Sequence, residues 1–161
     1  MFEFSSNYSN IINSAGKSVL KNKMTDIAKT IEPSSENKEN EIKMYILVNS
    51  DLDMGKGKIA AQVGHVVGVI VEEIIRNSYE VPTKESMIDF QYYQKWIKND
   101  AFTKIVLRAT EDELRQLLNT EKKCRYIIDA SRTHNSSRDL TVVGFFPRDD
   151  MEERMSKFRL L

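Results

Sequence analysis

The chain has 161 residues, of which 40% are apolar, enough to give one compact domain a buried core. Lysine plus arginine and aspartate plus glutamate each number 24, so the formal net charge is zero. A protein that coats nucleic acid by charge alone is more basic, so any nucleic-acid site must be a local patch. The single cysteine, Cys124, excludes an intramolecular disulfide and fits a reducing compartment.

Nothing in the chain predicts membrane insertion or secretion. No run approaches the roughly 20 apolar residues that span a bilayer. The N-terminus lacks the basic start and apolar run of a secretory signal. We therefore expect a cytoplasmic protein that makes no membrane contact.

The composition changes near residue 42. Residues 1–42 are rich in asparagine, serine, lysine and glutamate and are expected to form a flexible extension, whereas residues 43–161 are expected to form the folded domain. Apolar residues at helical spacing between about residues 18 and 30 leave two readings of the extension open. It is either a mobile tail or a tail with a short amphipathic helix that packs on the domain or on a partner.

Within the domain, the hydrophobic pattern predicts the order β-α-α-β-α-β-β-α. Strands are expected at residues 44–48, 103–109, 124–130 and 140–146. Helices are expected at about 56–77, 89–98, from the capping box that starts at Thr110, and at 148–156. Residues 158–161 fit an edge strand. This order favours an α/β sandwich with a mixed sheet.

The most informative segment is residues 51–65, DLDMGKGKIAAQVGH. It places two glycines and two lysines where a strand turns into a helix. The free N–H groups and positive dipole at a helix start, together with lysines, suit a phosphate or a developing oxyanion. Lys58, Gln62 and His65 share one stripe of this helix, which predicts a catalytic or RNA-facing row. A solvated loop followed by an ordinary helical histidine fits the same residues.

A second polar segment, DASRTH at residues 129–134, directly follows an apolar strand. Functional groups in open α/β sheets gather beyond the carboxyl ends of strands. Asp129 is suited to orient a water or a lysine, Thr133 offers a hydroxyl, and Arg132 is suited to phosphate. A polar turn capped by the aspartate is the alternative.

Other site motifs do not fit. The P-loop pattern fails because Gly57 follows Lys56 and Ser50 stands where the first glycine belongs. The calcium-loop spacing is incomplete, and two histidines with one cysteine make no zinc cluster. A dinucleotide fingerprint is also absent from the sequence.

Taken together, residues 51–65 and 129–133 resemble the two motifs of the archaeal and eukaryotic peptidyl-tRNA hydrolases, in the same order. Residues 141–144, TVVG, are similar to the strand that follows in that family, and the ending FRLL at 158–161 is similar to its usual ending. The resemblance extends over about residues 43–161. Ser131 and His134 depart from the family pattern, which commonly has glycine and glutamine there.

The resemblance implies a three-layer-like sandwich in which helices flank a four-stranded mixed sheet, usually a homodimer, with no metal or other cofactor. It implies hydrolysis of the ester between a peptide and the 3′ end of tRNA, which recycles tRNA for translation. Carried over by position, the residues clustered at the family's active site are Lys58, Gln62, His65, Asp129 and Thr133. Lys56 matches a basic position nearby, and further candidates for tRNA phosphate contacts are Arg132, Lys104 and Arg138.

The expected mechanism uses a water that Asp129 positions, with Thr133 in reach, and an oxyanion that Lys58 stabilises. Direct attack by Thr133 with His65 as its base is the less favoured route. Two other functions stay open. One is a member of the same fold that binds tRNA or protein without turnover, and the other is an unrelated small α/β interaction module.

Overall fold

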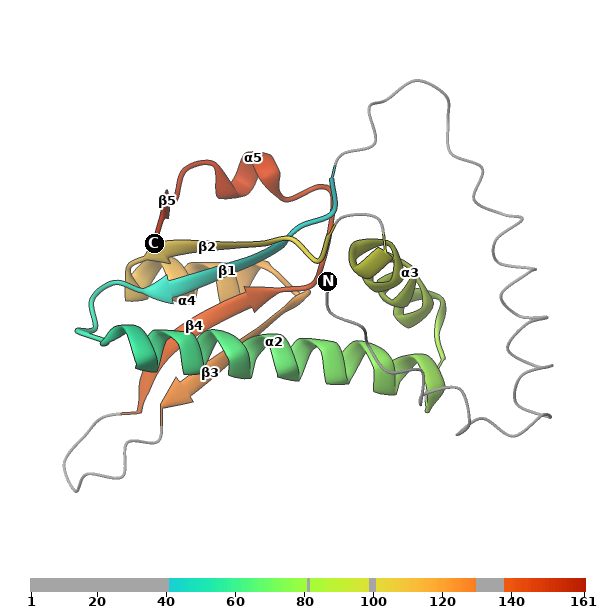
Figure 1. Ribbon diagram of the computed structural model, residues 1–161, viewed down its shortest axis with the longest axis horizontal. Helices are drawn as coiled ribbons and strands as arrows, with labels where there is room; N and C mark the ends of the chain where they lie inside the picture. The colour runs from blue at the N-terminus through green and yellow to red at the C-terminus, as the bar shows by residue number, and fades with distance from the viewer. Residues whose placement is uncertain (1–40, 81, 99–100, 130–137) are drawn as a thin grey trace. The chain divides into compact units, whose positions relative to one another are not determined.

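The computed structural model describes residues 41–80, 82–98, 101–129 and 138–161 (Figure 1). The strands are β1 (Met44–Asn49), β2 (Lys104–Ala109), β3 (Cys124–Asp129), β4 (Asp139–Phe145) and β5 (Arg159–Leu160). The helices are α2 (Lys56–Tyr79), α3 (Lys84–Lys98), α4 (Glu111–Thr120) and α5 (Glu152–Met155). None of these helices in the described part of the chain combines the length and apolarity needed to cross a bilayer.

One mixed sheet holds these strands in the order β3-β4-β1-β2-β5. β1 and β2 are parallel, and the other neighbouring pairs are antiparallel. The mixed α/β class is confirmed, but the expectation of four strands is wrong, because the sheet has five. The fifth strand is the edge strand expected at residues 158–161, and it forms where Leu160 and Arg159 pair with Leu107 and Arg108 at the free edge of β2.

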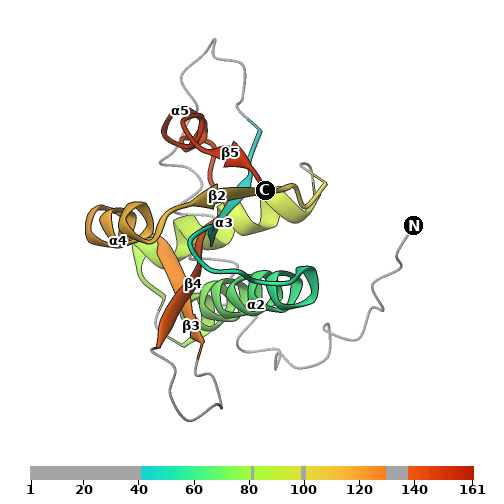
Figure 2. The ribbon, with the colours of Figure 1, turned by 90° about the vertical axis from the view of Figure 1, so that its left-hand side faces the viewer.

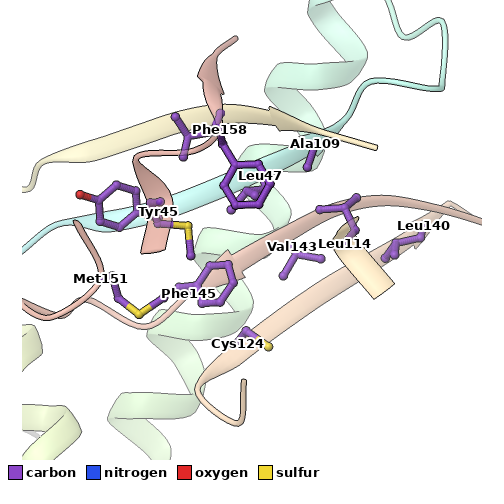
Figure 3. Close-up of a cluster of buried hydrophobic side chains, with 12 residues drawn as sticks. Tyr45, Leu47, Ala109, Leu114, Cys124, Leu140, Val143, Phe145, Met151 and Phe158 are labelled. Carbon is purple, nitrogen blue, oxygen red and sulfur yellow. The ribbon is translucent and has the colours of Figure 1, made fainter. Parts of the chain in front are cut away.

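Helices cover both faces of the sheet, with α2 and α4 on opposite sides (Figure 2). On one face, α2 and α3 pack over a cluster that includes Ile46, Val142 and Trp96. On the other face, Leu114 of α4 packs over Phe145 and its neighbours (Figure 3). Met155 of α5 belongs to the same cluster. All six residues of β1 are buried, which explains why this central strand reads as a continuous apolar run.

Two helices differ from the expected bounds. α3 begins at Lys84 instead of about residue 89, because Thr83 and Ser86 exchange hydrogen bonds between their side chains and backbone N–H groups. This reciprocal cap lets the helix begin at Lys84, two residues after Pro82. α5 is shorter than the expected 148–156, because Arg148 is held in a bridge to Lys43.

Gly144 fixes the distance between α2 and the sheet. A Cβ atom at this position would lie 2.9 Å from Cγ2 of Val66 and 3.0 Å from Cδ1 of Ile70. Both side chains belong to α2 and are fully buried. The helix therefore packs closer to β4 than any larger residue at position 144 would permit.

We predict that Gly144→Ala lowers the free energy of unfolding by about 1–3 kcal/mol, because the added methyl group overpacks this contact. Gly64→Ala is the matched control, since Gly64 is exposed on α2 and a Cβ there meets no atom within 4 Å. The control should gain up to about 1 kcal/mol from helix propensity. Chemical denaturation of both variants measures the difference, and equal stabilities would show that the close approach is unimportant.

Candidate active site

The first turn of α2 is an open, positively charged helix start. Gly55 is the N-cap residue and has no side chain that could bond the first N–H groups. Residues 56–59 hold two lysines and no acid. In contrast, α4 begins with a complete capping box between Thr110 and Glu113 and has three acidic residues in its first turn. The start of α2 is thus left free to attract negative charge.

Lys58 lies beside Asp129, the last residue of β3. The Lys58 Nζ atom is 2.5 Å from Oδ2 of Asp129. The Lys58 side chain is 47% exposed and that of Asp129 is 23% exposed, so the pair lies at the surface and is open to a ligand. An exposed pair of this kind contributes at most about 1 kcal/mol to stability. The pair joins two segments that are distant in the sequence, and a role in catalysis explains this position better than its small contribution to stability.

Gln62 lies one turn beyond Lys58 and points into the protein. It is 8% exposed, and the Thr141 hydroxyl lies 3.2 Å from its Oε1 atom. The same hydroxyl donates to the carbonyl of Ile127 at 3.0 Å. The Thr141 hydroxyl of β4 therefore lies between Gln62 of α2 and the Ile127 carbonyl of β3, next to the Lys58–Asp129 pair.

A β-bulge aims Thr141 at Gln62. Ile127 pairs with Val142 and Ile128 pairs with Leu140, which leaves Thr141 as an extra residue on β4. Val142 belongs to the cluster under α2, whereas Leu140 belongs to the cluster on the opposite face. The bulge thus reverses which side chains of β4 face α2.

Asn49, the last residue of β1, forms hydrogen bonds at the same end of the sheet. Its side-chain nitrogen donates to the carbonyl of Leu140 at 2.7 Å, and its Oδ1 accepts from the N–H of Asp51 at 2.9 Å. Asp51 in turn accepts from the backbone N–H of Glu111 at the start of α4. The sequence patterns did not predict Asn49 or Thr141 as site residues. A buried asparagine at the end of an apolar strand was a usable signal, whereas no sequence pattern marks the bulge.

Of the remaining candidate residues that the structure describes, only Lys104 lies far from the Lys58–Asp129 pair. His65 and Lys56 are exposed on α2, and Arg138 is exposed directly before β4. Lys104 lies at the opposite end of β2, about 16 Å along the strand from the end that faces the start of α2. There its Nζ atom donates to the carbonyl of Phe102 and lies 3.4 Å from the centre of that ring, and burial lowers its pKa. Arg132 and Thr133 lie outside the described residues.

The arrangement of Lys58 and Asp129 suits the hydrolysis of an ester or a related acyl compound. A carboxylate that is partly exposed can accept a proton from water. An ammonium group and the N–H groups of a helix start can stabilise an oxyanion that forms beside them. In the described part of the chain, no three histidine, cysteine, aspartate or glutamate side chains converge as metal ligands.

The sequence of this chain is similar to those of known proteins from one family. The family model "Peptidyl-tRNA hydrolase PTH2" matches residues 42–161. A peptidyl-tRNA hydrolase of Sulfolobus acidocaldarius is 37% identical over 111 residues, which cover 66% of this chain and 87% of the relative. One from Saccharolobus solfataricus is 35% identical over 109 residues, covering 66% and 86%. The "Probable peptidyl-tRNA hydrolase 2" of Schizosaccharomyces pombe is 33% identical over 114 residues, covering 68% and 50%.

Proposed function

We propose that this chain, which belongs to the peptidyl-tRNA hydrolase PTH2 family, hydrolyses the ester that joins a peptide to the 3′ end of tRNA. The observation that carries the proposal is the Lys58–Asp129 pair at the open start of α2. Residues 43–161 would form the catalytic domain, with residues 1–42 as an extension. A role in recycling tRNA for translation implies a cytoplasmic location.

In the proposed reaction, a water oxygen attacks the carbonyl carbon of the ester and Asp129 takes the proton from that water. The carbonyl oxygen becomes an oxyanion, and Lys58 stabilises it with the N–H groups at the start of α2. The bond between the carbonyl carbon and the ribose oxygen then breaks, and the ribose oxygen receives the proton from Asp129. The products are a peptide carboxylic acid, which ionises, and a tRNA with a free 3′ hydroxyl.

The other motif residues support this centre in the proposal. Gln62 holds the start of α2 against β4 through Thr141. Thr133 would hydrogen-bond the attacking water, and His65 would orient the substrate or contact RNA. Attack by Thr133 itself is disfavoured because a threonine hydroxyl requires a strong base next to it.

Cations on this side of the domain are the proposed contacts for tRNA phosphates. Lys56 and Arg138 are exposed near the Lys58–Asp129 pair, and Arg132 follows Asp129 closely in the sequence. Lys104 would meet a more distant part of the tRNA, because it lies at the other end of β2. Contacts of this kind predict that affinity falls as the salt concentration rises.

We predict that Lys58→Ala and Asp129→Ala each lower kcat about 10²–10³-fold. The assay is release of tRNA from N-acetylated aminoacyl-tRNA by the full chain. Arg76→Ala is the matched control, since Arg76 is 48% exposed on the same helix and forms an equivalent surface ion pair with Glu72. All three variants should melt within a few degrees of the wild type.

Full activity in both site variants would contradict the assignment of the site. Tight binding of tRNA without turnover by the wild-type protein would instead favour a binding member of the family.

A homodimer is the proposed assembly, supported by the exposed face of β3. β3 is an edge strand, and its residues Tyr126 and Ile128 are 50% and 43% exposed. A second copy of the chain that covers these apolar residues would remove them from water and cover the strand edge.

We predict that Ile128→Lys converts the dimer to a monomer, because a lysine would be buried in the interface without a partner. Ile97→Lys is the matched control, since Ile97 is an aliphatic residue that is 40% exposed on α3 and not on β3. Light scattering during size-exclusion chromatography measures the mass. A wild-type protein that is already monomeric, or a variant that stays dimeric, would overturn this interface.

A further inference from the structure

A groove of about 810 Å³ lies beside the start of α2, on the flank away from Asp129. One wall is formed by Lys56, Ile59, Ala60 and Val63, which follow one another at helical spacing. The ends of β1 and β2 form the floor, and Leu160 and Leu161 form the far wall. Its volume is within the range of about 300–1,000 Å³ that is typical of pockets for small ligands.

The groove is aliphatic. Val48, Val106, Ile59 and Val63 contribute branched side chains, and the far wall is provided by Leu160, which is 69% exposed. Among the described residues that line the groove, none is aromatic. Nucleic-acid bases are usually held by stacking on aromatic rings, so this surface is poorly suited to a base. It is well suited to the side chains of a peptide, which gain free energy when apolar area is buried.

The charged side chains along the groove have one sign. Lys56 and Arg108 line it, and none of its described lining residues has an acidic side chain. The Nε atom of Arg108 donates to the carbonyl of Leu160, which holds the guanidinium at the rim. A positively charged group placed in the groove would be repelled, whereas a neutral amide chain with exposed carbonyl oxygens would be accepted.

The groove is continuous with the candidate active site. Lys58 lies between Lys56 and Ile59 in the first turn of α2, and those two neighbours line the groove. Asn49 also lines the groove and bonds the carbonyl of Leu140 on the strand next to β3. An acyl group whose carbonyl lies over the first turn of α2 therefore extends into the groove when its ribose lies on the Asp129 side.

We propose that this groove binds the peptidyl part of the substrate, that it prefers aliphatic residues next to the ester, and that it rejects residues with a positive charge. The inference rests on the proposed hydrolysis of peptidyl-tRNA. It also predicts that the enzyme discriminates between a peptidyl ester and a simple aminoacyl ester. The α-amino group of a simple aminoacyl ester is largely protonated at neutral pH and would meet Lys56 and Arg108, whereas the corresponding nitrogen of a peptide is an uncharged amide.

The test compares release of tRNA from N-acetyl-Leu-tRNA, N-acetyl-Gly-tRNA and N-acetyl-Lys-tRNA by the full chain. The wild type should favour the leucyl substrate. Ala60→Trp, which fills the groove, should lower kcat/KM for the leucyl substrate about tenfold and leave the glycyl substrate nearly unchanged. Gly68→Trp is the control, because it adds the same side chain on α2 where a Cβ meets no atom within 4 Å.

Charge reversal tests the second half of the inference. Arg108→Glu should raise kcat/KM for the lysyl substrate about fivefold relative to the leucyl substrate. Arg115→Glu, an exposed arginine on α4, should leave this ratio as in the wild type. An unchanged ratio in Arg108→Glu would overturn the electrostatic part of the inference.

Two kinetic results would contradict the proposal that the groove binds the peptidyl part of the substrate. If Ala60→Trp lowers kcat/KM equally for all three substrates, the groove binds the tRNA end and not the peptide. If the variant behaves as the wild type with all three, the groove does not take part in substrate binding.

A binding measurement separates this inference from the proposed function. Titration of the labelled protein with the dipeptide N-acetyl-Leu-Leu should shift the amide NMR signals of Ala60 and Val63. Such shifts without any tRNA release would support the groove while the proposed hydrolysis fails. No shifts at millimolar peptide would overturn the groove as a peptide site, whatever the turnover assay gives.

Discussion

The close contact between α2 and β4 is the constraint on which the rest of this structure depends. Gly144 lets the helix approach the sheet until Val66 and Ile70 fill the space where a side chain would stand. The bulge at Thr141 then turns a hydroxyl toward the helix, where it meets Gln62. Lys58 is one turn from Gln62 on the same helix. The contact at Gly144 and the contact between Thr141 and Gln62 therefore position the Lys58 ammonium group next to Asp129.

This placement concentrates positive potential in a protein whose formal net charge is zero. α2 begins with lysines and an uncapped glycine, whereas α4 begins with acidic residues and a capping box. The two helix starts therefore have opposite electrostatic character although both follow strands of the same sheet. The start of α2 also separates two surfaces with different chemistry. The flank toward β3 holds the Lys58–Asp129 pair, and the other flank faces an aliphatic groove with cations at its rim.

Sequence patterns predicted the features that depend on local periodicity or on a motif. The buried strand at β1, the long helix α2 and the capping box at Thr110 were visible because each has a local signature. The motifs also predicted that Lys58 and Asp129 lie close together, and their side chains form an ion pair. The sequence patterns did not predict a feature that depends on pairing between strands distant in the sequence. The bulge at Thr141 exists only because the neighbouring strand defines its register, whereas the edge strand expected at residues 158–161 is confirmed as β5. The start of α3 was predicted too late because the cap between Thr83 and Ser86 was not recognised.

The central claim is that Lys58 and Asp129 act together on one ester. A double-mutant cycle for kcat/KM with Lys58→Ala, Asp129→Ala and the combined variant tests this most directly. Residues that act as a unit are strongly non-additive, because the loss of one removes most of what the other contributes. The account predicts that the combined variant is about as active as the weaker single variant. A combined loss equal to the product of the two single losses would show that they act independently and would contradict the account.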